Sequence, residues 1–133
     1  MQNAAGKYAS RFQRGEASRI FIAARLAAWC LGTAIVVLSV VPPDLRPETF
    51  VPHDLEHFVI YAITGCAFGI GYRQRLSLLA IWLVIFSGCV EVTQLFVPGR
   101  HARLGDFIVD AIASCVGLIS GALLRRIVRG FQA

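Results

Sequence analysis

One acidic residue lies inside an apolar run that is long enough to cross a membrane. Glu91 belongs to the segment Ser77 to Val97, which contains no other charged residue. A carboxylate at such a depth costs a few kcal/mol, so it usually faces protein or a water-filled cavity. Gln94 follows one helical turn later. The pair therefore indicates a buried polar site rather than a surface facing lipid.

Other polar residues flank the neighbouring apolar runs. The candidate site consists of the acid/base candidates Glu91 and His57 and the binding candidates Tyr61, Gln94, Arg100, Arg103, Asp106 and Asp110. On a helix, His57 and Tyr61 share one face at a spacing of four, as do Asp106 and Asp110. Asp110, Ser114 and the glycines that follow extend that second stripe. We expect these faces to meet inside the protein.

These residue types suit proton transfer and the binding of an anion. The apolar surround of Glu91 suits a general acid or base, and His57 could partner it. Arg100 and Arg103 could hold a phosphate or carboxylate, because guanidinium groups match their geometry and a following helix N-terminus adds partial positive charge. His53 and His57 have a metal-ligand spacing, but this spacing alone is a weak signal. We expect no metal and no cofactor.

The composition favours an integral membrane protein. Of the 133 residues, 56% are hydrophobic and 16% are charged, whereas soluble domains average about 25% charged. The net charge is +5, but the basic residues stand in small groups at segment ends, which argues against a nucleic-acid partner. The four cysteines form no CxxC pair and are interpreted as small buried hydrophobic residues.

Four apolar segments predict an all-α integral membrane bundle of four transmembrane helices. A spanning helix needs about 20 apolar residues. The predicted spans are approximately 20–41, 55–72, 76–97 and 107–124, within a transmembrane domain of residues 20–128. Residues 1–19 are predicted to be a basic cytoplasmic segment, either amphipathic or disordered, and residues 129–133 a cytoplasmic tail. Because the connections are short, neighbouring helices should be antiparallel.

The distribution of arginines predicts the orientation. The N-terminal segment, the turn with Arg73 and Arg75, and the C-terminal end are basic, so both termini should be cytoplasmic. The two remaining loops should then be external. Arg100 and Arg103 lie in the second of these loops, against the usual preference, which indicates a role other than topology.

Simpler interpretations exist for several of these residues. Asp106 could be the N-cap of the fourth span, and Asp54 or Glu56 could cap the second. Glu91 and Asp110 lie too far from the helix ends to cap them, so their structural alternative is an ion pair between helices. Buried pairs often contribute little net stability, which makes a purely structural pair a weak explanation.

Small residues predict where the helices pack most closely. Gly117 and Gly121 continue the stripe of Asp110, and Gly65 and Gly69 form a second small-xxx-small surface. Such surfaces let helices approach closely in lipid. We expect them to draw the bundle together beneath the polar residues.

Several motifs together resemble the VanZ-like family. They are Glu-His-Phe-x-x-Tyr at 56–61, Glu91-x-x-Gln94, Pro98-Gly99-Arg100, and Asp106-x-x-x-Asp110 with glycines beyond. The resemblance covers about residues 53–121. It implies that His57, Glu91, Gln94, Arg100 and Asp106 are the signature polar residues. The chain lacks the Asp-Lys that often precedes the histidine, and it has Asp110 where many members have Asn.

The resemblance implies a small multi-pass protein of the bacterial inner membrane; the family's namesake is associated with teicoplanin resistance. The expected function is to bind or act on a lipid-linked cell-envelope intermediate, or its head group, in an outward-facing polar pocket. Whether the chain is an enzyme stays open. The alternatives are a non-catalytic lipid- or antibiotic-binding protein and a structural subunit of an envelope polysaccharide assembly. The expected partner is a membrane lipid or lipid-linked intermediate, with a homo-oligomer or membrane-protein partner left open.

Overall fold

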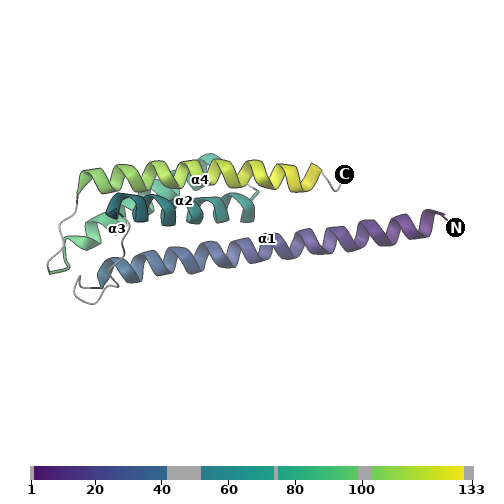
Figure 1. Cartoon of the computed structure of the whole chain (residues 1–133), viewed down its shortest axis with the longest axis horizontal. Helices are drawn as coiled ribbons and strands as arrows, with labels where there is room; N and C mark the ends of the chain where they lie inside the picture. Colours follow the sequence, from purple (N-terminus) through teal and green to yellow (C-terminus); the bar gives the residue numbers. More distant parts are fainter. Residues whose placement is uncertain (1, 42–51, 74, 99–102, 131–133) are drawn as a thin grey trace.

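Four α-helices make up the part of the chain that the structure, a computed structural model, describes. The described residues are 2–41, 52–73, 75–98 and 103–130. For residues 2–14, 17, 53 and 54 the description covers the backbone alone. The helices are α1 (Gln2–Val40), α2 (His53–Gly71), α3 (Leu76–Gln94) and α4 (Leu104–Gly130), and no strand occurs in these ranges. Consecutive helices run in opposite directions along one long axis (Figure 1). The prediction of an all-α fold with antiparallel neighbours is therefore confirmed.

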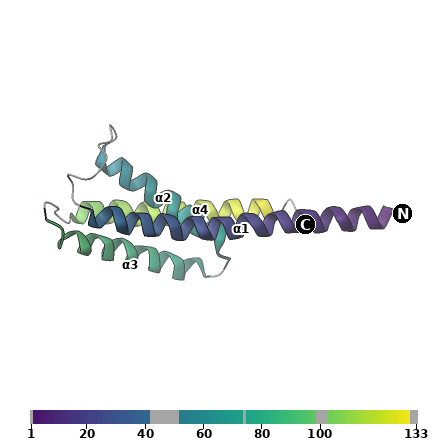
Figure 2. The same cartoon turned by 90° about the horizontal axis from the view of Figure 1, so that it is seen from below.

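Two helices extend beyond the predicted apolar spans. The backbone of α1 is helical from Gln2, so the N-terminal segment is a helix rather than a disordered lead-in. This part of α1 continues past the ends of the other helices (Figures 1 and 2). Helix α4 has 27 residues and begins at Leu104, three residues before the predicted start. Hydropathy alone does not register such extensions, because they contain charged residues.

Three of the helices are long and apolar enough to cross a membrane: Ser18–Val40 within α1, and the whole of α3 and α4. The apolar part of α2, Leu55–Gly71, is shorter. Large apolar side chains such as Trp29 and Trp82 are mostly exposed on the outside, at 62% and 65%. Polar side chains are buried inside instead. Such an arrangement would be unfavourable in water and is typical of a protein surrounded by lipid.

Helices α2 and α4 form the closest pair, and glycines make this approach possible. A Cβ atom on Gly65 would collide with the backbone of Ser114, and one on Gly117 would collide with the backbone of Ala62. Gly69 and Gly121 are equally confined by the facing helix. The predicted small-residue surfaces therefore face each other. Close contact of backbones is how helices gain packing energy in lipid, where the hydrophobic effect does not drive them together.

The C-terminal end of α2 is held by arginines from both neighbouring helices. Arg25 of α1 donates from Nε to the carbonyl oxygen of Gly71 at 2.8 Å. Arg125 of α4 donates from Nη1 to the carbonyl oxygen of Ile70, also at 2.8 Å. The last carbonyls of a helix have no partner within it and carry partial negative charge, so arginine is a favourable partner. These bonds anchor the shortest apolar helix at one end.

Candidate polar site

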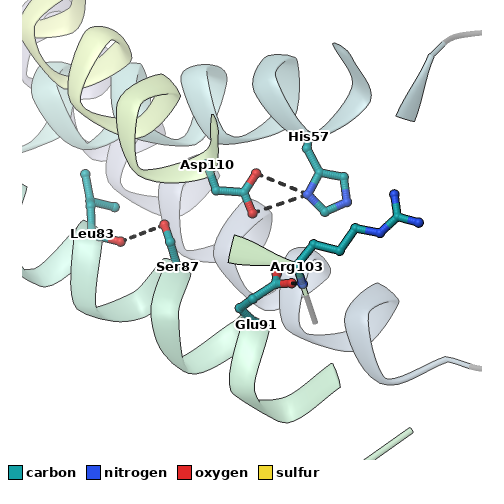
Figure 3. A network of polar contacts seen from close by, with 6 residues as sticks. All are labelled: His57, Leu83, Ser87, Glu91, Arg103 and Asp110. Carbon is teal, nitrogen blue, oxygen red and sulfur yellow. Dashed lines mark hydrogen bonds and ion pairs between the residues drawn. The ribbon is translucent and has the colours of Figure 1, made fainter. Parts of the chain in front are cut away.

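The polar side chains gather where α2 and α4 begin and α3 ends. Figure 3 shows His57 from α2, Asp110 from α4 and Glu91 from α3 around one interior region. A small apolar cluster that includes Ile35, Tyr61, Val90 and Ala113 lies at the same level of the bundle. Polar side chains from three helices therefore lie in one region of the bundle.

His57 and Asp110 form the best-defined pair of the site. The distances from His57 Nδ1 to the two carboxylate oxygens of Asp110 are 3.1 and 3.2 Å. The side chain of Asp110 is completely buried, and that of His57 is 12% exposed. Since an ionised carboxylate only accepts hydrogen bonds, Nδ1 carries the proton in this pair. Asp110 thereby orients the imidazole ring and leaves the lone pair of a neutral imidazole on Nε2.

Glu91 has a different direct partner from the one expected. Its Oε1 accepts the backbone N–H of Arg103 at 2.6 Å, immediately before α4 begins. Glu91 lies within electrostatic range of His57, but the residue hydrogen-bonded to His57 is Asp110. The second oxygen, Oε2, is buried and has no hydrogen-bond partner among the described residues. Glu91 therefore ties α3 to the start of α4 and keeps an unused acceptor inside the bundle.

Two further predicted residues are buried with unused hydrogen-bonding capacity. Tyr61 is 2% exposed and its ring stacks beside that of His57, with centroids 6.2 Å apart. Gln94 is 5% exposed. Within the described ranges, the Gln94 amide nitrogen has no hydrogen-bond partner, and the Tyr61 hydroxyl lies near the Asp110 carboxylate without a hydrogen bond of good geometry. Buried polar groups in this state are costly, unless water or a ligand satisfies them.

The remaining predicted residues have more varied positions. The Arg103 side chain is exposed, while its backbone binds Glu91. Asp106 is half-buried in the first turn of α4, so it is not the N-cap of that helix. Pro52 stands at the N-cap of α2, so the expected caps of that helix by Asp54 or Glu56 are wrong. Arg100 lies outside the described residues.

The candidate metal ligands receive no support from the geometry. Among the described side chains, no group of three or more His, Cys, Asp and Glu residues is arranged to hold a metal ion. The side chain of His53 lies outside the description.

Two cavities adjoin the polar cluster. The first has a volume of about 230 Å³ and lies between α1 and α2, where His57, Tyr61, Glu56 and Ser39 contribute polar groups. The second has a volume of about 580 Å³ and lies between α1, α2 and α3, with a lining that is almost entirely apolar and includes Trp82. Tyr61 packs against Phe86, which lines the second cavity, at 6.4 Å between ring centroids.

Two residues of this region were not recognised from the sequence as parts of the site. Ser39 is 4% exposed and lines the smaller cavity, and Glu56 lines it too, with Oε1 buried and unpartnered among the described residues. A serine within an apolar helix is too common a feature to single out. Glu56 belongs to the motif at 56–61, but its position also suits a helix cap, so the motif alone does not mark it as a site residue.

The comparisons with known proteins add no assignment. Neither the family models nor the curated proteins nor the solved structures yield a match to this chain.

Proposed function

We propose that this chain is a VanZ-like protein that binds the polar head group of a lipid-linked cell-envelope intermediate. The observation that carries this proposal is the pair of buried, unused hydrogen-bonding groups on Glu91 and Gln94, in the region where Tyr61 packs against Phe86 at the edge of an apolar cavity. The polar groups suit a head group with hydroxyl or amide functions, and the cavity of about 580 Å³ suits part of a hydrocarbon chain. Sites for small ligands combine these two features.

The proposal includes an orientation in the membrane. All four helices cross the bacterial inner membrane, the polar site faces outward and both termini are cytoplasmic. With 19 residues at 1.5 Å each, α2 is roughly 28 Å long, close to the hydrocarbon thickness of about 30 Å. Arginines at its C-terminal end agree with a cytoplasmic position, because Lys and Arg are enriched on that side.

The arrangement also supports proton transfer. With Nδ1–H bound to Asp110, the imidazole of His57 is oriented for proton exchange with a hydroxyl group of the ligand. Glu91, whose Oε2 is unused, supplies a second acceptor in the same region. Arg103 provides an exposed guanidinium for an anionic part of the head group. Turnover is a further step beyond binding and has its own test.

Binding is tested with protein in nanodiscs that contain a polyprenyl diphosphate sugar, followed by native mass spectrometry. We expect wild-type protein to retain this lipid, and Glu91→Gln and His57→Phe to lower retention by roughly tenfold, the effect of losing about one hydrogen bond to a polar ligand. Glu16→Gln is the matched control, because Glu16 is an exposed acid on α1. Equal retention by all four proteins would refute head-group recognition by this site.

Turnover and resistance are tested with the same variants. If the chain is an enzyme, the lipid is converted by wild-type protein and remains unchanged with His57→Phe. If expression raises the tolerance of cells to teicoplanin, as the resemblance implies, Glu91→Gln should abolish the increase at equal protein level. Retention of lipid without conversion favours the non-catalytic binding protein.

The orientation is tested by labelling introduced cysteines on intact cells with a membrane-impermeant maleimide. Gly105→Cys and Gly130→Cys are suitable, since both glycines are exposed and have open space around them. They lie near opposite ends of α4. In a background with the four native cysteines replaced, we expect labelling of Gly105→Cys only. Labelling of Gly130→Cys alone would reverse the orientation.

A further inference from the structure

A second cavity-lining cluster, far from the polar site, consists of arginines. Arg73 at the end of α2 and Arg125, Arg126 and Arg129 near the end of α4 line a cavity of about 250 Å³. These residues lie at the end of the bundle where α4 finishes, opposite the polar site (Figure 1). Four guanidinium groups around one cavity repel each other unless an anion is present.

Nothing in the described part of the chain neutralises this charge. The four arginines form no ion pair with an acidic side chain in the described ranges. The sequence provides few candidates, because Glu16 is the only acidic residue in α1, in the turn between α2 and α3, or in the second half of α4. Arg73 and Arg129 both lie within electrostatic range of Arg125, so the positive charges reinforce one another.

Arg125 is the fixed member of this cluster. It is 7% exposed, its Nη1 binds the Ile70 carbonyl, and its guanidinium lies 4.4 Å from the ring centroid of Phe21. Its Nε is buried and has no partner among the described residues. Arg126 and Arg129 are exposed and can adjust to a ligand. A rigid guanidinium with mobile neighbours is a favourable design for an anion with several oxygens.

We propose that this arginine cluster binds the phosphate of an anionic phospholipid. The cavity lies beside the lipid-facing surfaces of α3 and α4, where a glycerophospholipid can place its phosphate among the arginines and its acyl chains on exposed apolar side chains. Basic pockets between membrane helices bind anionic head groups in this manner. Such a lipid would also shield the mutual repulsion of the arginines that hold α2. This site is independent of the polar site and of the proposed function.

The test compares the wild-type chain, an Arg73→Gln/Arg126→Gln/Arg129→Gln variant and an Arg19→Gln control, in which an exposed arginine of α1 outside the cavity lining is replaced. Each is delipidated in neutral detergent, and a phosphatidylglycerol titration is followed by native mass spectrometry. We expect the triple variant to bind roughly a hundredfold more weakly than wild type, because it lacks three arginines near the head group. Arg125 is left in place so that the contact with α2 persists.

Three controls make the outcome decisive. Phosphatidylcholine should bind weakly to all three proteins, and inorganic phosphate in neutral detergent reports binding of the anion without a lipid. If inorganic phosphate saturates the cluster and phosphatidylglycerol binds no more tightly, the cluster binds a free anion. That result would overturn the proposal of a lipid ligand. An equal loss in Arg19→Gln, or equal binding by the triple variant with intact helicity, would overturn the site. Recovery with lysine at the three positions would support it.

Discussion

The two ends of this bundle hold charged groups in opposite ways. At the polar site, Asp110 and His57 bind each other, and Glu91 binds a backbone N–H. At the other end, Arg25 and Arg125 bind backbone carbonyls of α2. The first arrangement joins helices through side chains and retains unused acceptors and donors. The second directs arginine donors at the end of one short helix.

This difference indicates separate tasks for the two ends. Arginines on the last carbonyls of α2 satisfy groups that every helix leaves unpaired, so they stabilise the fold directly. The unused Glu91 Oε2 and Gln94 amide nitrogen lower stability instead, unless water or a ligand binds them. Proteins retain such destabilising groups mainly at functional sites. Measurements of stability should therefore separate the two ends.

The largest loss of folded protein should come from separating α2 and α4, because the contact between these helices positions residues at both ends of the bundle. Gly117→Leu would force a side chain into the Ala62 backbone, so we expect almost no folded protein, measured as the monodisperse fraction in detergent. Gly105→Leu is the matched control on the same helix, since nothing lies within 4 Å of its Cβ position. Normal yield of Gly117→Leu would contradict the close approach.

The next largest effect should come from the polar pair. Asp110→Leu removes the acceptor of the His57 N–H and should lower the free energy of unfolding by about 3 kcal/mol, measured by titration with sodium dodecyl sulfate in mixed micelles. A double-mutant cycle of His57→Phe and Asp110→Asn isolates the pair, with an expected coupling of about 1–3 kcal/mol. Additive effects would mean that the two residues act separately.

A smaller loss should follow at the arginine end. Arg125→Met retains much of the side-chain volume but removes the donor to Ile70, so we expect a loss of about 1–2 kcal/mol in the same titration. Part of the loss is offset, because Arg73 and Arg129 then experience less repulsion. Arg126→Met is the control at an exposed neighbouring position. If both variants lose equally, the contact with α2 is not what stabilises this end.

The smallest change should be a slight gain. Ser114 is completely buried on α4, and its hydroxyl has no partner in the described part of the chain. Ser114→Ala should therefore leave stability unchanged or raise it by less than about 1 kcal/mol, because an unsatisfied polar atom is removed. A clear loss in the same titration would show that the hydroxyl is bonded in the membrane, for example by water, and would extend the polar site deeper along α4.

Much of the fold was predictable because each helix has a strong local signal. Long apolar runs predicted the helices, and Gly65, Gly69, Gly117 and Gly121 predicted the close pair. Hydropathy did not predict that α1 begins at Gln2. It also gave no sign that Cys30 and Cys89 are exposed, because an apolar sequence does not distinguish a lipid-facing side from an interior side.

The candidate site was predictable as a set of residues but not as a set of contacts. Glu91, Gln94, Asp110 and Tyr61 are all buried, as their helical spacing indicated. The partner of His57 was expected to be Glu91 and is Asp110. Both carboxylates lie near the same end of the bundle, so residue type and topology could not decide between them.

The sequence by itself determined the helical, lipid-compatible character of this protein and the separation of its acidic and basic residues. Apolar length and charge position are local properties, and they act before any helix meets another. Only the tertiary structure decided that Asp110 meets His57 and that Arg25 and Arg125 bind the end of α2. Each residue turns a helix by about 100°, so partners depend on how each helix is rotated and crossed. The glycine contact between α2 and α4 fixes the rotation and the crossing of these two helices.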